Sequence, residues 1–301
     1  MTPRAIVTGA SGFIGRHLVA ALARGTEVHV LSARAGKAAP GTHRHRLDLR
    51  RAAPTSLLRE IAPHVIYHLA APAESHVALP DLAYYESIVI ATGHLLEGAR
   101  DAGVPRVVLA GSAKEYGAAA PAGTRLRESH LPRPLTPYAV AKLACTHMAG
   151  VYHHRDGLVV TTLRLFPVFG PGMPEQTLIV RAIRAAAAGR DLPMTFGRQT
   201  RDLLYVDDAV RAFQAAGVVA EPYAGVLNVC TGRAVTVQQA VQLVFALAGT
   251  RARLRLGALR YPPFEIRNLC GDPSAARRRL GWRARVALDD GLRRTLQTFG
   301  V

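Results

Sequence analysis

Tyr138 and Lys142 are the two residues of this 301-residue chain whose types and spacing point most directly to chemistry. They are four positions apart, so on a helix their side chains share one face, about 6 Å apart along the axis. A phenol with a pKa of about 10 is a poor base at neutral pH, but a neighbouring ammonium favours the phenolate, and a positive nicotinamide ring would add to this effect. The pair therefore predicts a tyrosine that exchanges a proton while a hydride moves to or from a nicotinamide cofactor.

A serine completes the candidate catalytic set. Ser112 closely follows the apolar run Arg106–Ala110, which predicts a strand. Ligands of open parallel α/β sheets bind at the carboxyl ends of the strands, so a hydroxyl placed there could hold the reacting oxygen. Taken alone, Ser112 could equally be a turn residue, but the tyrosine and lysine that follow favour the catalytic role. We also expect Lys142 to bond the nicotinamide ribose.

The elements that must position these residues alternate regularly up to about residue 165. Short β-branched or apolar runs alternate with helical periodicity, which is typical of βαβ units and a parallel sheet. We therefore expect a dinucleotide-binding domain over residues 1–165, to which parts of 198–232 return, and a smaller, mainly substrate-binding lobe over 166–301. The runs that predict one doubly wound α/β sheet are Arg4–Thr8, Glu27–Leu31, His45–Leu47, Val65–Leu69, Arg106–Ala110 and Leu158–Leu165.

A long segment rich in glycine and proline, Ala118–Pro137, predicts a surface loop of a type that is usually functional. It ends where a helix is expected to begin, with Thr136 as the N-cap and Pro137 at the first helical position. In the second half the periodicity loosens, and helices are expected near residues 175–188, 207–219, 235–248 and 274–280.

Three glycines follow the first predicted strand and open a predicted helix. Gly9, Gly12 and Gly15 have the spacing GxxGxxG, which differs from the commonest dinucleotide fingerprint. Glycines at this junction let the backbone turn tightly and approach a pyrophosphate, whose charge the helix N-terminus stabilises. A plain strand-to-helix turn is the alternative, but the position at the first βα junction favours a cofactor site. The cofactor contacts predicted here are Gly9, Ser11, Gly12, Phe13, Ile14 and Gly15.

The end of the second predicted strand should meet the adenine ribose of the cofactor. An acid there would indicate NAD, but the chain offers Ser32 and Arg34 instead. Because an arginine suits a 2′-phosphate, this favours NADP over NAD, although Arg34 could also be an ordinary solvated loop residue.

The charge of the chain is strongly positive, with 38 basic and 21 acidic residues and a net charge of +17. Only three of the basic residues are lysines, and the arginines are spread along the chain rather than gathered on one helix. No helix-turn-helix, zinc or aromatic-basic motif accompanies the charge, so an anionic small substrate is favoured over a nucleic-acid partner.

Three cysteines, Cys145, Cys230 and Cys270, are far apart and form neither a metal-ligand spacing nor a disulfide framework. No metal site is therefore expected, and the chain is assigned to a reducing, cytoplasmic setting. A strand is predicted almost at the first residue, which leaves no room for a signal peptide, and no apolar run reaches membrane-spanning length.

Several motifs together resemble one enzyme family. The glycine loop, the Tyr138/Lys142 pair and five further segments are similar to the extended short-chain dehydrogenase/reductases with a Rossmann-type sheet, and more narrowly to the NAD-dependent epimerase/dehydratase family, which acts on nucleotide sugars. The match covers nearly the whole chain. The further segments are His68–Ala71, Gly111–Gly117, Arg164–Gly172, Arg201–Asp208 and Gly271–Trp282.

The resemblance implies roles by position. It implies that Ser112, Tyr138 and Lys142 are catalytic and that the last two also contact the cofactor. It also implies a homodimer, because the helices that carry Leu95–Leu96 and Leu143–Met148 have apolar faces that in this family often pair two subunits. Further implied cofactor contacts are Asp48, Leu49, Leu69, Ala70, Ala71, Phe166 and Val168, and implied substrate contacts are Ser75, Pro167, Arg201 and Arg260.

Departures from the family pattern bear on the reaction. Members that eliminate water carry an Asp-Glu pair after the catalytic hydroxyl, whereas this chain has Ala113 and Lys114 there. Pro167 stands where an asparagine usually contacts the substrate, and Ile88 replaces a second usual asparagine. The first difference disfavours elimination, and the other two predict an unusual placement of the substrate.

Three functions stay open. The first is a reductase of a nucleotide-linked 4-keto-6-deoxyhexose that uses NADH or NADPH. The second is a nucleotide-sugar 4-epimerase, dehydratase or decarboxylase with tightly bound NAD. The third is a non-catalytic Rossmann regulator or nucleic-acid binder, which the intact catalytic set disfavours.

Overall fold

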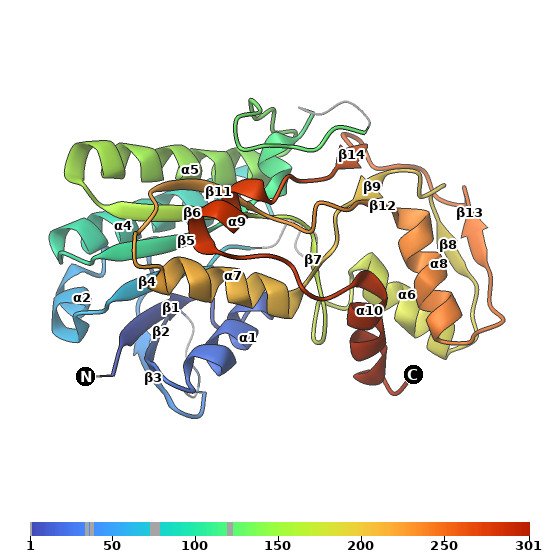
Figure 1. The fold of residues 1–301 in the computed structure, drawn as a ribbon, viewed down its shortest axis with the longest axis horizontal. Helices are drawn as coiled ribbons and strands as arrows, with labels where there is room; N and C mark the ends of the chain where they lie inside the picture. Colours follow the sequence, from blue (N-terminus) through green and yellow to red (C-terminus); the bar gives the residue numbers. More distant parts are fainter. Residues whose placement is uncertain (1, 34–35, 37–38, 73–78, 119–122) are drawn as a thin grey trace.

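A computed structural model describes residues 2–33, 36, 39–72, 79–118 and 123–301. Its centre is a seven-stranded sheet in the order β11-β6-β5-β4-β1-β2-β3, in which every neighbouring pair is parallel (Figure 1). The predicted doubly wound, Rossmann-type α/β fold is thus confirmed. The strands of this sheet are β1 (Arg4–Thr8), β2 (Glu27–Ser32), β3 (Thr42–Arg46), β4 (Val65–His68), β5 (Arg106–Ser112), β6 (Val159–Leu165) and β11 (Gly225–Val229).

Helices cover both faces of this sheet, as expected for parallel strands that are buried on both sides. On β1, Ala5 and Val7 face one helical layer, whereas Ile6 faces the other. The first layer holds α1 (Phe13–Leu22), α7 (Val206–Val218) and α9 (Ser274–Leu280). The second holds α2 (Thr55–Ile61), α4 (Ala91–Asp101) and α5 (Pro137–Asp156), with α3 (Asp81–Tyr84) and the π-turn η1 (Tyr85–Ile90) leading into α4.

A smaller lobe lies beside the sheet (Figure 1). Its apolar core forms where Ile183 of α6 and Val244 of α8 meet Leu292 of α10. The lobe's elements, with the short strands that join it to the sheet, are β7 (Val168–Phe169), α6 (Leu178–Ala187), β8 (Leu192–Met194), β9 (Thr200–Arg201), β10 (Leu204–Tyr205), β12 (Val235–Thr236), α8 (Val237–Leu247), β13 (Leu254–Leu256), β14 (Asn268–Leu269) and α10 (Leu288–Gln297).

Several elements were not predicted, among them one strand of the main sheet and the last helix. The seventh strand, β11, pairs with β6 although its sequence GVLNV carries a polar residue, Asn228, which is fully buried. The last helix, α10, has the sequence LDDGLRRTLQ, in which an apolar residue recurs only every fourth position. The six predicted strands are all present within a few residues of their expected bounds, and the four predicted helices are present as well.

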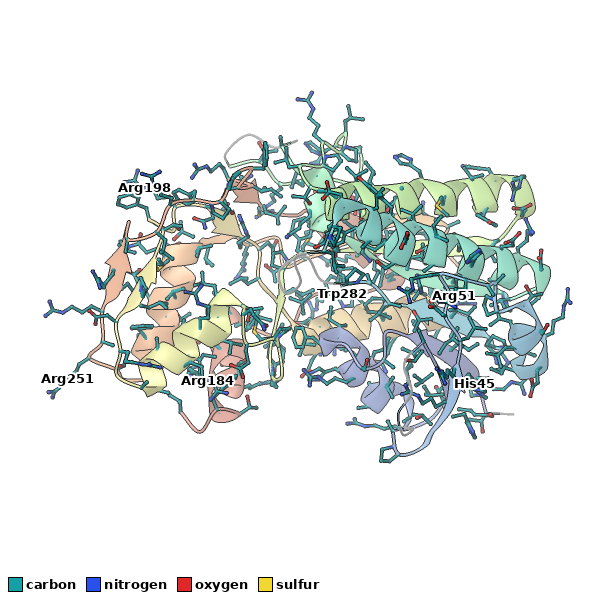
Figure 2. All side chains as sticks on the ribbon, turned by 180° about the vertical axis from the view of Figure 1, so that it is seen from behind. His45, Arg51, Arg184, Arg198, Arg251 and Trp282 are labelled. Carbon is teal, nitrogen blue, oxygen red and sulfur yellow. The ribbon has the colours of Figure 1, made fainter. Side chains whose placement is uncertain are left out.

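One buried tryptophan fastens the end of the chain to the first helical layer. Trp282 lies near the centre of the molecule (Figure 2), and its indole N–H donates to the Asp208 carbonyl of α7 at 3.0 Å. The Asp208 carboxylate accepts the backbone N–H groups of Arg285 and Val286 at 2.8 and 2.9 Å. The chain that leads into α10 is therefore tied to the sheet domain.

Some of the many arginines lie on the surface of the small lobe. Figure 2 shows Arg184, Arg198 and Arg251 on the outside of that lobe, and Arg184 pairs there with Glu175. Across the described part of the chain, no helix has both the length and the apolar composition that a membrane span requires.

Candidate active site

A cavity of about 860 Å³ lies between the carboxyl ends of the sheet strands and the small lobe. Ser112, Lys114 and Tyr138 line it from the sheet domain, and Gln199 and Arg201 line it from the small lobe. The position agrees with the rule that ligands of doubly wound sheets bind beyond the carboxyl ends of the strands.

The predicted Tyr138–Lys142 pair occupies the first turns of α5. The helix begins as expected, because the Thr136 hydroxyl accepts the Ala139 N–H at 3.3 Å and Pro137 takes the first position. The Lys142 ammonium donates to the Ala110 carbonyl of β5 at 2.8 Å and lies 5.9 Å from the centre of the Tyr138 ring. Helix and strand thus hold the two side chains together at the edge of the cavity.

The Lys142 ammonium is 7% exposed, and its surroundings act on its charge in two ways. Burial lowers the pKa of Lys142, while the nearby Cys145 and Glu115 oppose this shift. The positive charge of Lys142 acts strongly on the Tyr138 phenol, because little water screens that charge.

Ser112 is the last residue of β5 and the N-cap of the 3₁₀ turn η2 (Ala113–Tyr116). Its hydroxyl accepts the Lys114 N–H at 3.2 Å, and its own N–H donates to the Glu115 carboxylate at 2.8 Å. This reciprocal capping box fixes the serine at the cavity wall beside Tyr138.

A buried ion pair below Ser112 was missed by the sequence reasoning. The Glu115 side chain is fully buried and accepts from Arg164 at 2.8 and 3.0 Å and from the Thr146 hydroxyl at 3.0 Å. A Cβ at Gly111 would lie 3.0 Å from the Glu115 carboxylate, so the glycine leaves room for the pair. The available signals were the capping-box spacing of Glu115 after Ser112 and an arginine inside the apolar strand β6.

The glycine loop has the crowding that a phosphate cradle requires. Gly9 has a φ of +72°, and a Cβ there would lie 2.6 Å from the Ala70 nitrogen. A Cβ at Gly15 would lie 2.1 Å from the Gly9 oxygen. No side chain caps the N-terminus of α1 at Gly12, so its backbone N–H groups suit a pyrophosphate. Ser11 is exposed at the same turn, and the loop fits a dinucleotide.

The end of β2 brings an unpredicted arginine to the predicted serine. Arg44 of β3 donates to the Ser32 hydroxyl at 3.3 Å, whereas Arg34 lies outside the described residues. Asp48 is engaged by the Arg50 guanidinium and backbone, and this hydrogen bonding lowers the pKa of Asp48 to about 2. The Leu49 side chain packs in the core, so a contact with adenine, which the resemblance implies, would have to come from the Leu49 backbone.

The turn after β4 lies against the glycine loop. Leu69, Ala70 and Ala71 are half-buried there, and the Ala70 N–H donates to the Thr8 hydroxyl at 3.1 Å. His68, the last residue of β4, contacts the Thr8 hydroxyl through Nδ1 at 2.7 Å. Its Nε2 lies 3.1 Å from the Thr92 hydroxyl. Burial lowers the pKa of His68 to about 3, so the ring is neutral at physiological pH.

We expect this histidine to make the fold sensitive to acid. With a pKa near 6.5 in the unfolded chain and about 3 in the folded one, the unfolded state binds the proton first. The contribution of neutral His68 to the free energy of unfolding is therefore fully present above pH 6.5. Below that pH the free energy of unfolding falls by up to about 1.4 kcal/mol per pH unit. Urea unfolding at pH 7.5, 6.0 and 5.0 would measure this loss. Glutamine cannot take up this proton on unfolding, so the free energy of unfolding of His68→Gln should depend less on pH. The same pH dependence in the variant and the original protein would contradict the assignment.

Only some of the predicted substrate contacts lie at the cavity. Pro167 lines the cavity together with Val168, while the Phe166 ring is almost fully buried in the wall. The Arg201 guanidinium lines the cavity but also pairs with Glu265 and donates to the Ile266 carbonyl at 2.8 Å. Arg260 is exposed and is not among the residues that line the cavity, and Ser75 lies outside the described residues.

The small lobe adds cavity residues that the sequence did not point to. Phe264 is 72% exposed and has a φ of +60°, which is unusual for a residue with a side chain. Glu265 beside it pairs with Arg201, and burial lowers the pKa of that arginine. Pro262 and Pro263 precede Phe264 on the same wall.

Comparisons with known proteins agree with this site. A UDP-glucose 4-epimerase from Mycolicibacterium smegmatis is 32% identical, with 98% of both chains covered. A dTDP-6-deoxy-L-talose 4-dehydrogenase (NAD(P)⁺) from Kitasatospora kifunensis is 33% identical, covering 96% of this chain and 93% of its own. The solved structure of MoeE5 in complex with UDP-glucuronic acid and NAD is 34% identical, covers 99% of both chains and superimposes with a TM-score of 0.89.

The family model of the NAD-dependent epimerase/dehydratase family matches residues 5–230, which include the glycine loop and the candidate residues Ser112, Tyr138 and Lys142. The predicted resemblance is therefore confirmed, and the chain is an enzyme that belongs to the NAD-dependent epimerase/dehydratase family.

Proposed function

We propose that this enzyme reduces the 4-keto group of a nucleotide-linked 6-deoxyhexose. The observation that carries the proposal is the placement of Ser112 and Tyr138 on one cavity wall, with the Lys142 ammonium held beside the tyrosine ring. Ala113 and Lys114 stand where an eliminating enzyme needs acids, so reduction is favoured over loss of water.

In this mechanism a dinucleotide held by Gly9, Gly12 and Gly15 would supply the hydride that the carbonyl carbon accepts. The Ser112 hydroxyl donates a hydrogen bond to the carbonyl oxygen, and the Tyr138 O–H bond breaks as its proton passes to that oxygen. The phenolate that remains is stabilised by Lys142 until a proton returns from water. Arg201, oriented by Glu265, is proposed to bind the diphosphate of the substrate.

The preferred hydride donor is proposed to be NADPH. The strand β2 ends at Ser32, without the acid that would bond a free 2′-hydroxyl. The Arg44 guanidinium donates to the Ser32 hydroxyl. A guanidinium there suits a 2′-phosphate, which it can bond with two parallel N–H groups.

Arg44→Ala is expected to weaken NADPH binding by about 10- to 100-fold and to leave NADH binding almost unchanged. The reason is that a hydrogen bond to a charged group contributes about 1.5–3 kcal/mol. Fluorescence titration of both cofactors would measure the two dissociation constants. Arg251→Ala, which removes an arginine on the outer side of the small lobe (Figure 2), controls for the lost net charge. Equal weakening of both cofactors by Arg44→Ala would contradict the assignment.

A 4-epimerase is the second candidate, because the Mycolicibacterium relative with that name aligns over nearly the whole chain. Such an enzyme would oxidise C4 transiently, with the same tyrosine taking the proton, and would keep NAD bound. Denaturing the purified protein and assaying the released dinucleotide separates the two candidates. Release of about one NAD per protein chain would contradict the proposed reductase.

Oxidation of dTDP-6-deoxytalose or GDP-6-deoxymannose with added NADP⁺, followed in the reverse direction of the proposed reaction, would support the reductase. Interconversion of UDP-glucose and UDP-galactose without added cofactor would support the epimerase instead.

We also propose a homodimer, but through different side chains from those expected. Leu95 and Leu96 are fully buried in the core of a single chain, so they cannot form a subunit interface. The outer face of α5 instead exposes Val140 by 41% and Val151 by 54%.

A further inference from the structure

A second lysine approaches the catalytic tyrosine. We propose that Lys114 is a further cationic residue of the catalytic site, whose ammonium group stabilises the Tyr138 phenolate together with Lys142. The Lys114 ammonium lies 5.8 Å from the centre of the Tyr138 ring, and the Lys142 ammonium lies 5.9 Å from it. The proposal rests on the role of Tyr138 in the proposed function and deepens it.

The turn η2 sets the direction of the Lys114 side chain. Its flanking residues, Ala113 and Glu115, are almost completely buried, whereas Lys114 is half-buried and lines the cavity. The Lys114 N–H donates to the Ser112 hydroxyl, and its carbonyl accepts the Gly117 N–H at 3.0 Å. The backbone that carries this lysine is therefore fixed to the catalytic serine.

The choice of residue type supports a specific role. The chain has 38 lysines and arginines, of which only Lys37, Lys114 and Lys142 are lysines. Lys37 lies outside the described residues, and the other two both face Tyr138. Elsewhere the chain uses arginine for positive charge. A compact ammonium acts as a point charge on a flexible stem, which suits a phenolate in a narrow site better than a planar guanidinium.

The charged and titratable groups around Tyr138 in the described structure leave a positive field at its ring. Lys142 approaches from α5 and Lys114 from η2, while Tyr84 of α3 meets the ring edge-on at 6.1 Å. Behind Lys142 lie His68, which is neutral, and Glu115, whose charge is met by Arg164. Two cations, carried by two different elements, therefore approach the Tyr138 ring.

The chemical consequence concerns the moment of proton transfer. As the hydride from NAD(P)H forms the new C–H bond, the Tyr138 O–H bond breaks and its proton goes to the substrate oxygen. The negative charge left on the phenol then faces both ammonium groups. Each cation at this range is expected to lower the pKa of an acid by about one pH unit or more.

The ionisation of Tyr138 can be measured without any substrate. Absorbance at 295 nm reports phenolate formation, and subtracting the titration of a Tyr138→Phe variant isolates this one tyrosine among the others. The same subtraction is made in a Lys114→Met background and in a Lys114→Arg background. Lys114→Gln serves as a second neutral variant if the methionine protein does not fold.

We expect the Tyr138 midpoint to rise by about one pH unit in Lys114→Met and to stay close to the original value in Lys114→Arg. The pH at which kcat of the reductase falls should rise in parallel, while KM for NAD(P)H stays constant. An unchanged midpoint in the neutral variants, or equal shifts in Met and Arg, would overturn the proposal. If Tyr138→Phe itself keeps full turnover, the proposed function fails instead, so the two failures are distinguishable.

Discussion

Tyr138→Phe is expected to lower kcat by a factor of about 10² to 10⁴, the range that a positioned general acid contributes. Phenylalanine keeps the ring that packs against Tyr84 and lies between the two lysines. It removes only the proton that passes to the substrate oxygen. Steady-state rates of dTDP-6-deoxytalose or GDP-6-deoxymannose oxidation would measure the loss.

The control for this variant is the binding of the cofactor and the stability of the fold. Phenylalanine keeps the ring and loses only the hydroxyl, so the thermal unfolding temperature should stay almost the same. The affinity for NAD(P)H should fall by no more than one lost hydrogen bond allows, about 0.5–1.5 kcal/mol. A variant that turns over at the original rate would exclude catalysis at this site and revive a non-catalytic role.

Glu115→Ala is expected to destabilise the fold by about 3–5 kcal/mol, because it leaves a buried, unpaired charge on Arg164. The Arg164 side chain is 3% exposed, and Arg164 lies on β6 opposite Gly111 of β5, the residue before Ser112. The variant also removes the acceptor of the Ser112 N–H. Urea unfolding at pH 7.5 would measure the change in the free energy of unfolding.

A matched pair of variants separates the charge from the hydrogen bond. Glu115→Gln keeps an acceptor for the Ser112 N–H, and Arg164→Met removes the cation while keeping an apolar stem. The double variant should be clearly more stable than the sum of the two single losses predicts, because no unpaired charge remains. Simple additivity would show that the ion pair does not act as one unit.

Features encoded in local patterns could be predicted from the sequence. The strand β1, the glycine loop and the start of α5 each depend on neighbouring residues, such as the Thr136 cap and the following Pro137. The Tyr138–Lys142 pair belongs to this class as well, because helical spacing alone places both side chains on one face.

Contacts between distant parts of the chain could not be predicted in the same way. Glu115 and Arg164 are 49 residues apart, and they meet only because β5 and β6 are neighbours in the sheet. Arg201 was expected to contact the substrate, but its partner Glu265 lies 64 residues further along the chain. Leu49 was assigned to adenine by position, and only the packing of the core shows that its side chain points elsewhere.

Two candidate catalytic residues, Ser112 and Lys142, are both held by the strand β5. Ser112 ends that strand, and Lys142 is bonded to the Ala110 carbonyl of the same strand. The positions of Ser112 and Lys142 are therefore set by the sheet domain and not by residues of the small lobe. Substitutions on the lobe's wall, around Phe264 and Gln199, are therefore expected to reshape the cavity while Ser112 and Lys142 keep their positions. New substrates are thus open to this scaffold without a redesign of its catalytic centre.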